Sequence, residues 1–231
     1  MMLAALEGEE LFEIVEREDG FITASSFGPG VYLAPFRRWA PQERRAMRLV
    51  RGRVLDVGAG AGRVALHLQE RGHEVVAIDL SPGAIEVCRR RGVRDARVLS
   101  IDDVDESLGT FDTVVMYGNN FGLFASAAKA RRLLRRFHRL TSDRGRIIAQ
   151  TRDVGGTDNP DHLEYQAYNR ERGRLSGQIR IRVRHRRYAT PWFDYLMVGP
   201  DELRDILEGT GWHLARTLEG EDTYMAVMEK D

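Results

Sequence analysis

Apolar and polar positions along the chain follow two periods, and the switches between them predict alternating strands and helices. Short apolar runs bounded by turn residues predict strands near residues 53–57, 74–78, 96–100, 111–117 and 145–151. Apolar residues spaced three to four positions apart predict helices near residues 62–71, 82–92 and 126–140. A further helix is expected after Pro200, followed by strands near 213–218 and 223–229. This alternation is typical of an α/β fold with a parallel sheet covered by helices on both faces.

Residues 152–199 interrupt this order, because they form a connection much longer than the ~2–6 residues usual in α/β units. Within it, residues 179–184 alternate strictly between apolar side chains and arginine. Strict alternation predicts a strand with one face on a core and one face open. We therefore expect a β-rich cap, inserted between the fifth strand and the following helix, over the carboxyl edge of the sheet.

The most informative segment is Val-Leu-Asp-Val-Gly-Ala-Gly-Ala-Gly-Arg at residues 54–63, where a buried strand leads into Asp56 and then into alternating glycines. Glycines allow a sharp turn and a close approach of the backbone to a ligand. The dinucleotide pattern would need a glycine where this chain has Arg63, and a phosphate-binding loop would need a lysine that is absent. A carboxylate at Asp56 suits a cationic amino group better than a pyrophosphate.

A second acid ends the next predicted strand, because Asp79 follows residues 74–78 and stands 23 positions after Asp56. This spacing is near the ~20-residue offset at which a carboxylate meets ribose hydroxyls in such folds. Ser81 and Pro82 then predict a capped helix start, which puts Asp79 at the carboxyl end of its strand. The two acids together fit one adenosine-containing ligand.

The chain resembles the class I S-adenosylmethionine-dependent methyltransferases through VLDVGAGAGR, VVAIDLSPGAIEVCRRRG and ARVLSIDDVDESLGTFDTVVMYGNN, over roughly residues 45–151 and the C-terminal end. The resemblance implies a Rossmann-like, seven-stranded, doubly wound sheet whose final strand is antiparallel, and S-adenosyl-L-methionine as the cofactor. We expect residues 1–231 to form a single methyltransferase domain, with an N-terminal lead-in at 1–45 and a substrate cap at 152–199.

The resemblance also assigns roles to residues. It implies that Asp56 and the glycine loop hold the methionine part, that Asp79 binds the ribose, and that Asp102 or Asp103 contacts the adenine amino group; spacing does not separate these last two acids. Residues 117–120 would face the sulfonium and the acceptor. The expected cofactor-binding residues are Asp56, Gly58, Ala59, Gly60, Gly62, Asp79, Leu80, Asp102, Asp103, Tyr117 and Gly118.

Methyl transfer from a sulfonium is an in-line displacement on an activated carbon, so alignment of the reactants can provide most of the acceleration and a strong base is optional. If a base is used, a histidine of the inserted segment is favoured, and His162 is the candidate, with Tyr117 as a second catalytic residue. Tyr32, Arg37 or Trp39 of the lead-in are candidates to close over the cofactor. The expected acceptor-site residues are Asn119, Asn120, Tyr165, Tyr168, Arg172 and Trp192.

Composition is that of an ordinary globular enzyme, with 231 residues, 42% hydrophobic and 30% charged. The acidic N-terminus and strand-sized apolar runs predict neither a signal peptide nor a membrane span, so a cytoplasmic location is expected. The single cysteine, Cys88, is predicted to be a buried structural thiol. No cluster has metal-ligand spacing, so no metal is expected. A homodimer is left open.

Charge is unevenly distributed, although the formal net charge is zero: residues 7–19 carry seven acids and one arginine, whereas residues 170–187 carry eight arginines and one glutamate. A small-molecule acceptor, methylated on oxygen or nitrogen, is the favoured interpretation, with nucleic acid disfavoured. One alternative is an RNA- or protein-directed methyltransferase that uses the arginine-rich strand, although residues 118–121 lack the Asn/Asp-Pro-Pro-aromatic run of base methylation. A further alternative is a non-catalytic protein that binds a nucleoside cofactor, or an enzyme that uses NAD.

Overall fold

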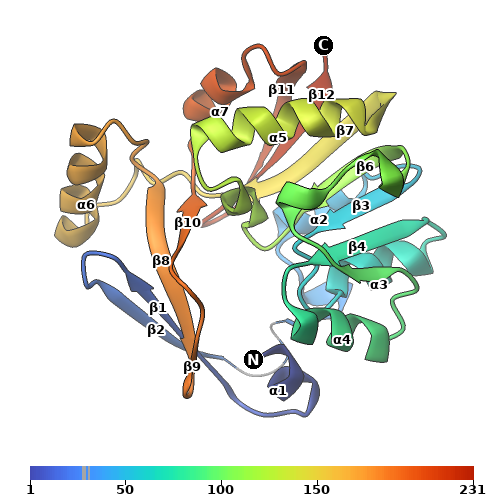
Figure 1. Cartoon of the computed structure of the whole chain (residues 1–231), viewed down its shortest axis with the longest axis horizontal. Helices are drawn as coiled ribbons and strands as arrows, with labels where there is room; N and C mark the ends of the chain where they lie inside the picture. The colour runs from blue at the N-terminus through green and yellow to red at the C-terminus, as the bar shows by residue number, and fades with distance from the viewer. Residues whose placement is uncertain (28–29, 31) are drawn as a thin grey trace.

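The computed structural model describes residues 1–27, 30 and 32–231, and its described strands form two sheets. The larger sheet has seven strands in the order β11-β12-β7-β6-β3-β4-β5 (Figure 1). β12 pairs antiparallel with both β7 and β11, whereas the pairings among the other strands are parallel. This confirms the predicted Rossmann-like fold with an antiparallel final strand. Its strands are β3 (Val54–Val57), β4 (Val75–Asp79), β5 (Ala96–Val98), β6 (Phe111–Met116), β7 (Thr141–Thr151), β11 (Trp212–Glu219) and β12 (Tyr224–Lys230).

Helices cover both faces of this sheet because its central strands are apolar on both sides. In β3, Val54 packs into one hydrophobic cluster and Leu55 into the other. The cluster of Leu55 includes Phe137 and Ile206 from α5 and α7, whereas the cluster of Val54 includes residues of α2, α3 and α4. These helices are α2 (Pro41–Met47), α3 (Arg63–Glu70), α4 (Pro82–Arg90), α5 (Ala127–Arg139) and α7 (Pro200–Leu207). The 3-10 turns are η1 (Phe36–Arg38), η2 (Ile101–Asp103), η3 (Glu106–Leu108) and η4 (Asn120–Phe124).

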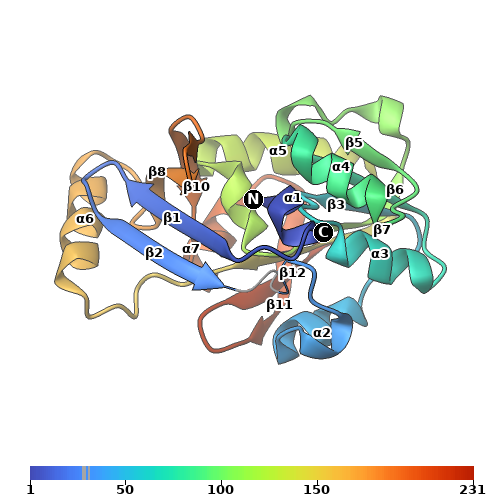
Figure 2. The ribbon, with the colours of Figure 1, turned by 90° about the horizontal axis from the view of Figure 1, so that it is seen from below.

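The smaller sheet, called here the cap sheet, joins the beginning of the chain to the inserted segment. Its order is β10-β8-β1-β2, with β9 paired to β8, and every pairing is antiparallel. Figure 2 shows the β1–β2 hairpin lying beside the inserted elements, with α6 against its far end. These elements are α1 (Met2–Leu6), β1 (Leu11–Arg17), β2 (Ile22–Phe27), α6 (Pro160–Glu171), β8 (Gln178–His185), β9 (Tyr188–Ala189) and β10 (Phe193–Leu196).

The cap therefore differs from the sequence-based expectation in two respects. Residues 152–199 do contribute strands, but they also contain α6, capped at Asn159, whose Oδ1 accepts a hydrogen bond from the Asp161 N–H at 2.9 Å. Residues 1–45 are more than a lead-in, because β1 lies in the middle of the cap sheet and pairs with β8. Positions 28, 29 and 31 of the predicted lead-in lie outside the described residues.

The uneven charge along the sequence follows from this pairing. In the register of β1 and β8, Glu16 faces Arg182, and its carboxylate receives hydrogen bonds from Arg182 at 2.7 Å and Arg184 at 2.9 Å. Glu18, directly after β1, pairs with Arg172 at 3.2 Å and Arg174 at 3.5 Å, which follow α6. The acidic and basic segments thus neutralise each other across the sheet. Among the helices of the described residues, none is long and apolar enough to cross a bilayer.

Candidate functional site

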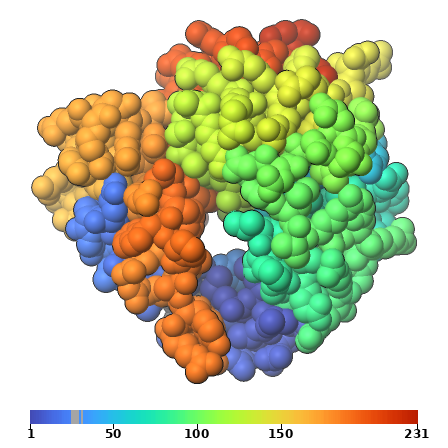
Figure 3. Space-filling model, in the orientation of Figure 1, coloured from blue at the N-terminus to red at the C-terminus, as the bar shows by residue number. Residues whose placement is uncertain are grey.

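A cavity of about 970 Å³ lies where the carboxyl ends of β3, β4 and β6 meet the cap sheet. Asp56, Asp79 and Tyr117 line it from the strand ends, while Trp192 and Met2 line it from the cap sheet and α1. Figure 3 shows this hollow between the orange cap strands and the green and teal elements of the large sheet. Ligands of open α/β sheets bind at this edge, so the position agrees with the predicted cofactor site.

The glycine loop lines the cavity, and its backbone leaves no room for a Cβ at Gly58 or Gly62. Gly58, Gly60 and Gly62 have positive φ angles of 73°, 55° and 77°. A Cβ on Gly58 would lie 2.4 Å from Nδ2 of Asn120, which donates hydrogen bonds to the carbonyls of Val57 at 3.0 Å and Gly58 at 2.8 Å. Asn120, expected in the acceptor site, therefore braces the glycine loop.

Cys88 packs beneath the same loop. Its thiol donates to the Gly60 carbonyl at 3.3 Å, and a Cβ on Gly62 would approach its Sγ to 3.0 Å. Burial, with the charges of Asp56 and Asp79, raises the pKa of Cys88 to about 12. The thiol is therefore protonated at neutral pH and fills space, as the sequence predicts.

Asp79 is held by the loop that it faces. Its Oδ2 accepts a hydrogen bond from the Gly60 N–H at 2.9 Å, and its Oδ1 accepts one from the Ser81 N–H at 2.8 Å. Burial raises the pKa of Asp79 although both hydrogen bonds lower it. Each carboxylate oxygen keeps a second lone pair, so Asp79 can still accept hydrogen bonds from two neighbouring hydroxyls.

Asp56 is the strongest electrostatic feature of the cavity. Its side chain is 2% exposed, and its Oδ2 has no hydrogen-bond partner among the described residues. Burial raises its pKa to about 7, an effect that Arg63 opposes and Asp79 reinforces. A buried, unpartnered carboxylate oxygen is costly, and a ligand ammonium placed against it would remove that cost.

Arg63 is a cavity residue that the sequence argument did not assign to the ligand. Its guanidinium forms an ion pair with the buried Glu43 of α2 at 2.5 Å and lies 4.6 Å from the centre of the Trp39 ring. The Tyr117 hydroxyl donates to the backbone carbonyl of Glu43 at 3.2 Å, which joins the same group. The sequence signal that could have pointed to Arg63 is its position directly after the glycine loop, where a dinucleotide-binding pattern would need a glycine.

The remaining predicted cofactor residues lie around the rim. Ala59, Leu80 and Gly118 line the cavity, and Leu80 is 72% exposed. Asp102 also lines it, whereas Asp103 does not. Partial burial of Asp102 opposes ionisation, but Lys129 at 2.6 Å and Arg132 at 3.0 Å hold its pKa below the ordinary value. Of the lead-in candidates, Tyr32 lines the cavity, Trp39 packs against Arg63, and Arg37 is not among the lining residues.

Two of the predicted reaction-site residues are constrained by other contacts. Tyr117 lines the cavity, but burial and the nearby Glu43 raise its pKa well above the ordinary value, so its hydroxyl stays protonated. Asn119 has a left-handed backbone at φ 65°, and its carbonyl accepts from the Tyr195 hydroxyl at 2.5 Å. The Oδ1 of Asn119 is buried without a partner among the described residues. Asn119 itself is not among the residues that line the cavity.

The other predicted acceptor residues lie apart from one another. Trp192 lines the first cavity with Arg182 stacked on its ring at 4.6 Å. His162 and Tyr165 of α6 instead line a second cavity of about 490 Å³ under the cap sheet. Arg172 stacks on the half-exposed Tyr168 at 3.6 Å, and neither residue lines either of these cavities. His162 is therefore not positioned beside Asp56, and its predicted role as a base gains no support from its placement.

Comparison with known proteins finds similarity to methyltransferases. A family model described as a methyltransferase domain matches residues 54–145. A ubiquinone biosynthesis O-methyltransferase of Methylocella silvestris is 40% identical over 81 residues, which cover 32% of each chain. A magnesium-protoporphyrin O-methyltransferase of Rhodobacter capsulatus is 39% identical over 67 residues, which cover 27% of this chain and 30% of that protein. The matched segments thus span about a third of these curated relatives.

A solved structure extends the likeness over the whole fold. It is the S-adenosyl-L-homocysteine complex of a SAM-dependent methyltransferase from Bacteroides fragilis, with a TM-score of 0.80 and 26% identity. The superposition covers 99% of this chain and 92% of that one. The likeness therefore includes the cap sheet, which lies outside the matched family model.

Proposed function

Because the chain belongs to the class I S-adenosylmethionine-dependent methyltransferases, we propose that it transfers a methyl group from S-adenosylmethionine to an oxygen or nitrogen atom of a small-molecule acceptor. The observation that carries this proposal is the arrangement of Asp56, the glycine loop and Asp79 around one cavity of about 970 Å³. It presents an unpartnered carboxylate oxygen, exposed backbone and a second carboxylate in the order that an amino acid joined to a nucleoside requires.

The residues of the cavity fit the cofactor from end to end. Asp56 would receive the ammonium group of the methionine part, and Arg63 would bind its carboxylate while remaining paired with Glu43. Asp79 would accept hydrogen bonds from the ribose hydroxyls. The exposed Leu80 would cover one face of the adenine, with Asp102 at its edge.

The chemistry asks little of the protein beyond placement. S-adenosylmethionine supplies a methyl group already activated by its sulfonium, so alignment of the acceptor is the main contribution of the chain. The N–H of Gly118 donates a hydrogen bond to Oε1 of Gln150 at 2.7 Å. This bond would fix the backbone against which the acceptor is aligned. Tyr117 is a poor candidate for a base, since its hydroxyl is protonated and bound to the Glu43 carbonyl.

Two observations favour a small-molecule acceptor over RNA or protein. The two curated relatives are named for ubiquinone biosynthesis and for magnesium-protoporphyrin, which are small molecules. The arginines of residues 170–187 that would serve a polyanion are largely paired with acids of the cap sheet, such as Glu16 and Glu18. Such pairing leaves little uncompensated charge for phosphates.

The proposal is tested by calorimetric titration of S-adenosylhomocysteine, S-adenosylmethionine and NAD. We expect both sulfur nucleosides to bind and NAD not to bind. A ligand at one hundred times its Kd should stabilise the fold by about 2.7 kcal/mol, which a thermal melt would detect. Binding of NAD alone would refute the proposal, and binding of the sulfur nucleosides without turnover of any acceptor would favour a non-catalytic protein.

A further inference from the structure

Both cavities are lined by residues that follow strands at the carboxyl edge of the large sheet. β6 and β7 are parallel neighbours, with Met116 opposite Ala149. Tyr117 and Gly118 follow β6 and line the first cavity, while Arg152 and Asp153 follow β7 and line the second. The chain segments that leave β6 and β7 therefore each contribute to one of the two cavities, and these strands are neighbours about 4.8 Å apart.

A mainly apolar wall encloses the second cavity on the cap side. In the register of the cap sheet, Arg17 faces Ile181, and this face also carries Val15 and Ile179. Together with Phe21 and Met197 they line a space of about 490 Å³. Small-molecule pockets are typically ~300–1,000 Å³, largely apolar, and supplied with a few convergent polar groups.

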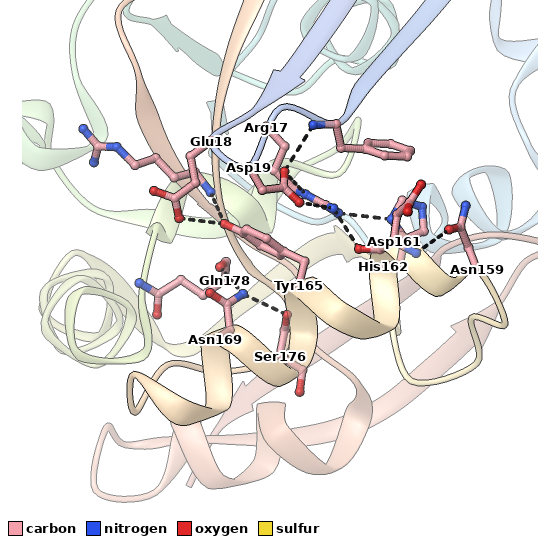
Figure 4. Close-up of polar contacts among 12 residues, drawn as sticks. Arg17, Glu18, Asp19, Asn159, Asp161, His162, Tyr165, Asn169, Ser176 and Gln178 are labelled. Atoms are coloured by element: carbon pink, nitrogen blue, oxygen red, sulfur yellow. Dashed lines mark hydrogen bonds and ion pairs between the residues drawn. The ribbon is translucent and has the colours of Figure 1, made fainter.

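The polar end of this cavity is built around Arg17, which is 7% exposed. Its guanidinium lies 4.1 Å from the centre of the Tyr165 ring and 4.8 Å from that of Phe21. It also donates to both carboxylate oxygens of Asp19 and to the Asp161 carbonyl at 2.9 Å (Figure 4). This residue is thus immobilised, and its charge is compensated by Asp19.

The contact with Arg17 selects one tautomer of the neutral His162 ring. Nη1 of Arg17 lies 3.1 Å from Nδ1 of His162. A dashed line in Figure 4 marks this contact. Arginine has donors only, so Nδ1 must be the acceptor and the ring proton must be on Nε2. Nε2 has no hydrogen-bond partner among the described residues. His162 therefore offers a hydrogen-bond donor to the cavity, which is the opposite of the predicted base.

We propose that the second cavity binds the body of the methyl acceptor, and that this acceptor is an uncharged, ring-sized apolar molecule whose carbonyl-type oxygen accepts a hydrogen bond from Nε2 of His162. This inference rests on the proposed methyl transfer, because only then is an acceptor required. The lining of this cavity disfavours a carboxylate, since it contains three acids, Asp153, Glu221 and Asp222, against two arginines, Arg17 and Arg152. The compensated Arg17 supplies no net positive charge that would reverse this preference.

Three phenols of similar size test the proposal on protein saturated with S-adenosylhomocysteine. They are 4-hydroxyacetophenone, which has the carbonyl, 4-ethylphenol, which lacks it, and 4-hydroxybenzoate, which is anionic. We expect 4-hydroxyacetophenone to bind about three- to tenfold more tightly than 4-ethylphenol, the value of one hydrogen bond, and 4-hydroxybenzoate to bind most weakly. Dissociation constants come from NMR titration, which also reports the His162 ring proton.

Variants separate the hydrogen bond from general packing. His162→Gln keeps a donor and should keep the preference for the carbonyl, whereas His162→Phe should abolish it. The matched control is His73→Phe, because His73 lies before β4 at the opposite end of the sheet, in contact with the Gly52 carbonyl at 2.8 Å. Ile179→Phe fills the cavity without touching the histidine, so it should weaken all three phenols even if His162→Phe fails to fold.

The outcomes also separate this proposal from the proposed function. If S-adenosylhomocysteine binds but the phenols do not, or if His162→Phe keeps the carbonyl preference, the acceptor assignment is overturned while methyl transfer stands. Tighter binding of 4-hydroxybenzoate than of 4-hydroxyacetophenone would overturn the uncharged class. If S-adenosylhomocysteine itself does not bind, the proposed function fails first.

Discussion

The large sheet and the cap sheet place ligand-facing side chains by different means. In the large sheet, Asp56, Gly58 and Gly60 belong to one strand and its following turn, so a short segment lines one side of the first cavity. In the cap sheet, Glu16 meets Arg182 across 166 positions of sequence. The first cavity therefore depends on backbone shape fixed locally, whereas the second cavity depends on two distant segments staying paired.

This difference predicts that a glycine substitution acts most strongly in the large sheet. Gly58→Ala would bring a Cβ to 2.4 Å from Nδ2 of Asn120 at a φ of 73°, so the loop must shift. We expect the affinity for S-adenosylhomocysteine, measured by calorimetry, to fall on the order of 100-fold, or about 2.7 kcal/mol.

The matched control is Gly20→Ala in the β1–β2 turn, where φ is 92° but no other atom lies within 4 Å of the added carbon. This variant should lose about 1 kcal/mol of unfolding free energy from backbone strain alone and keep its affinity for the nucleoside. Equal losses of affinity in the two variants would show that the cap sheet shapes the cofactor cavity as much as the glycine loop does.

The next largest effect is expected from removal of the buried charge of Asp56 in the large sheet. Asp56→Asn should weaken binding of S-adenosylhomocysteine about 10- to 100-fold, because a charged hydrogen bond to the ligand ammonium is lost. The ligand-free protein should gain stability toward urea, because a buried carboxylate with a raised pKa is replaced by a neutral amide. Loss of both affinity and stability would mean that Asp56 is instead satisfied within the fold.

The same carboxylate predicts a pH dependence that the cap sheet should not share. With a pKa of about 7, Asp56 is mostly protonated at pH 6, so binding at pH 6 should be about tenfold weaker than at pH 8 and should release a proton. Between the unfolded pKa near ~4 and about 7, the native state holds the extra proton, so the contribution of Asp56 to stability falls as pH rises.

Calorimetry in buffers of different ionisation enthalpy measures this proton release. Asp79, whose pKa is also raised, adds to the effect in the same direction, while Arg63 opposes it. The Asp56→Asn variant should show a much flatter profile. An unchanged profile in that variant would assign the dependence to Asp79.

The contrast between the sheets also explains what the sequence could predict. The strand ends at Asp56 and Asp79 follow from local apolar runs and turn residues, and the structure brings both acids to one cavity. The β1–β2 hairpin could not be predicted in the same way, because residues 11–17 pair with β8, which is distant from them in the sequence. Complementary charge was the available signal, since the acids of residues 7–19 pair with the arginines of residues 170–187.

The position of His162 in the second cavity could not be predicted from sequence for the same reason. A histidine in an inserted segment is a reasonable base when only its position in sequence is known. In the structure its Nδ1 lies 3.1 Å from Nη1 of Arg17, a residue 145 positions away. Hydrogen-bond polarity of this kind is set by a tertiary contact and has no local signature.

The smallest effect is expected in the cap sheet, where single charges are partly exposed and share partners. Glu18 accepts hydrogen bonds from Tyr165 at 2.9 Å and Arg172 at 3.2 Å and ties α6 to the end of β1. Glu18→Gln should lower the free energy of unfolding by less than about 1 kcal/mol, because exposed ion pairs contribute little, and should leave nucleoside affinity unchanged. Its local effect should be larger, since the cap sheet depends on non-local contacts. Amide hydrogen exchange in β1 and α6 should accelerate, whereas that in β3 and β4 should not.

Glu86→Gln, which breaks the exposed pair with Arg90 at 2.8 Å within α4, is the matched control and should accelerate neither region. Faster exchange throughout both sheets after Glu18→Gln would mean that the cap and the cofactor half open as one unit, and the distinction between them would then hold for assembly but not for stability.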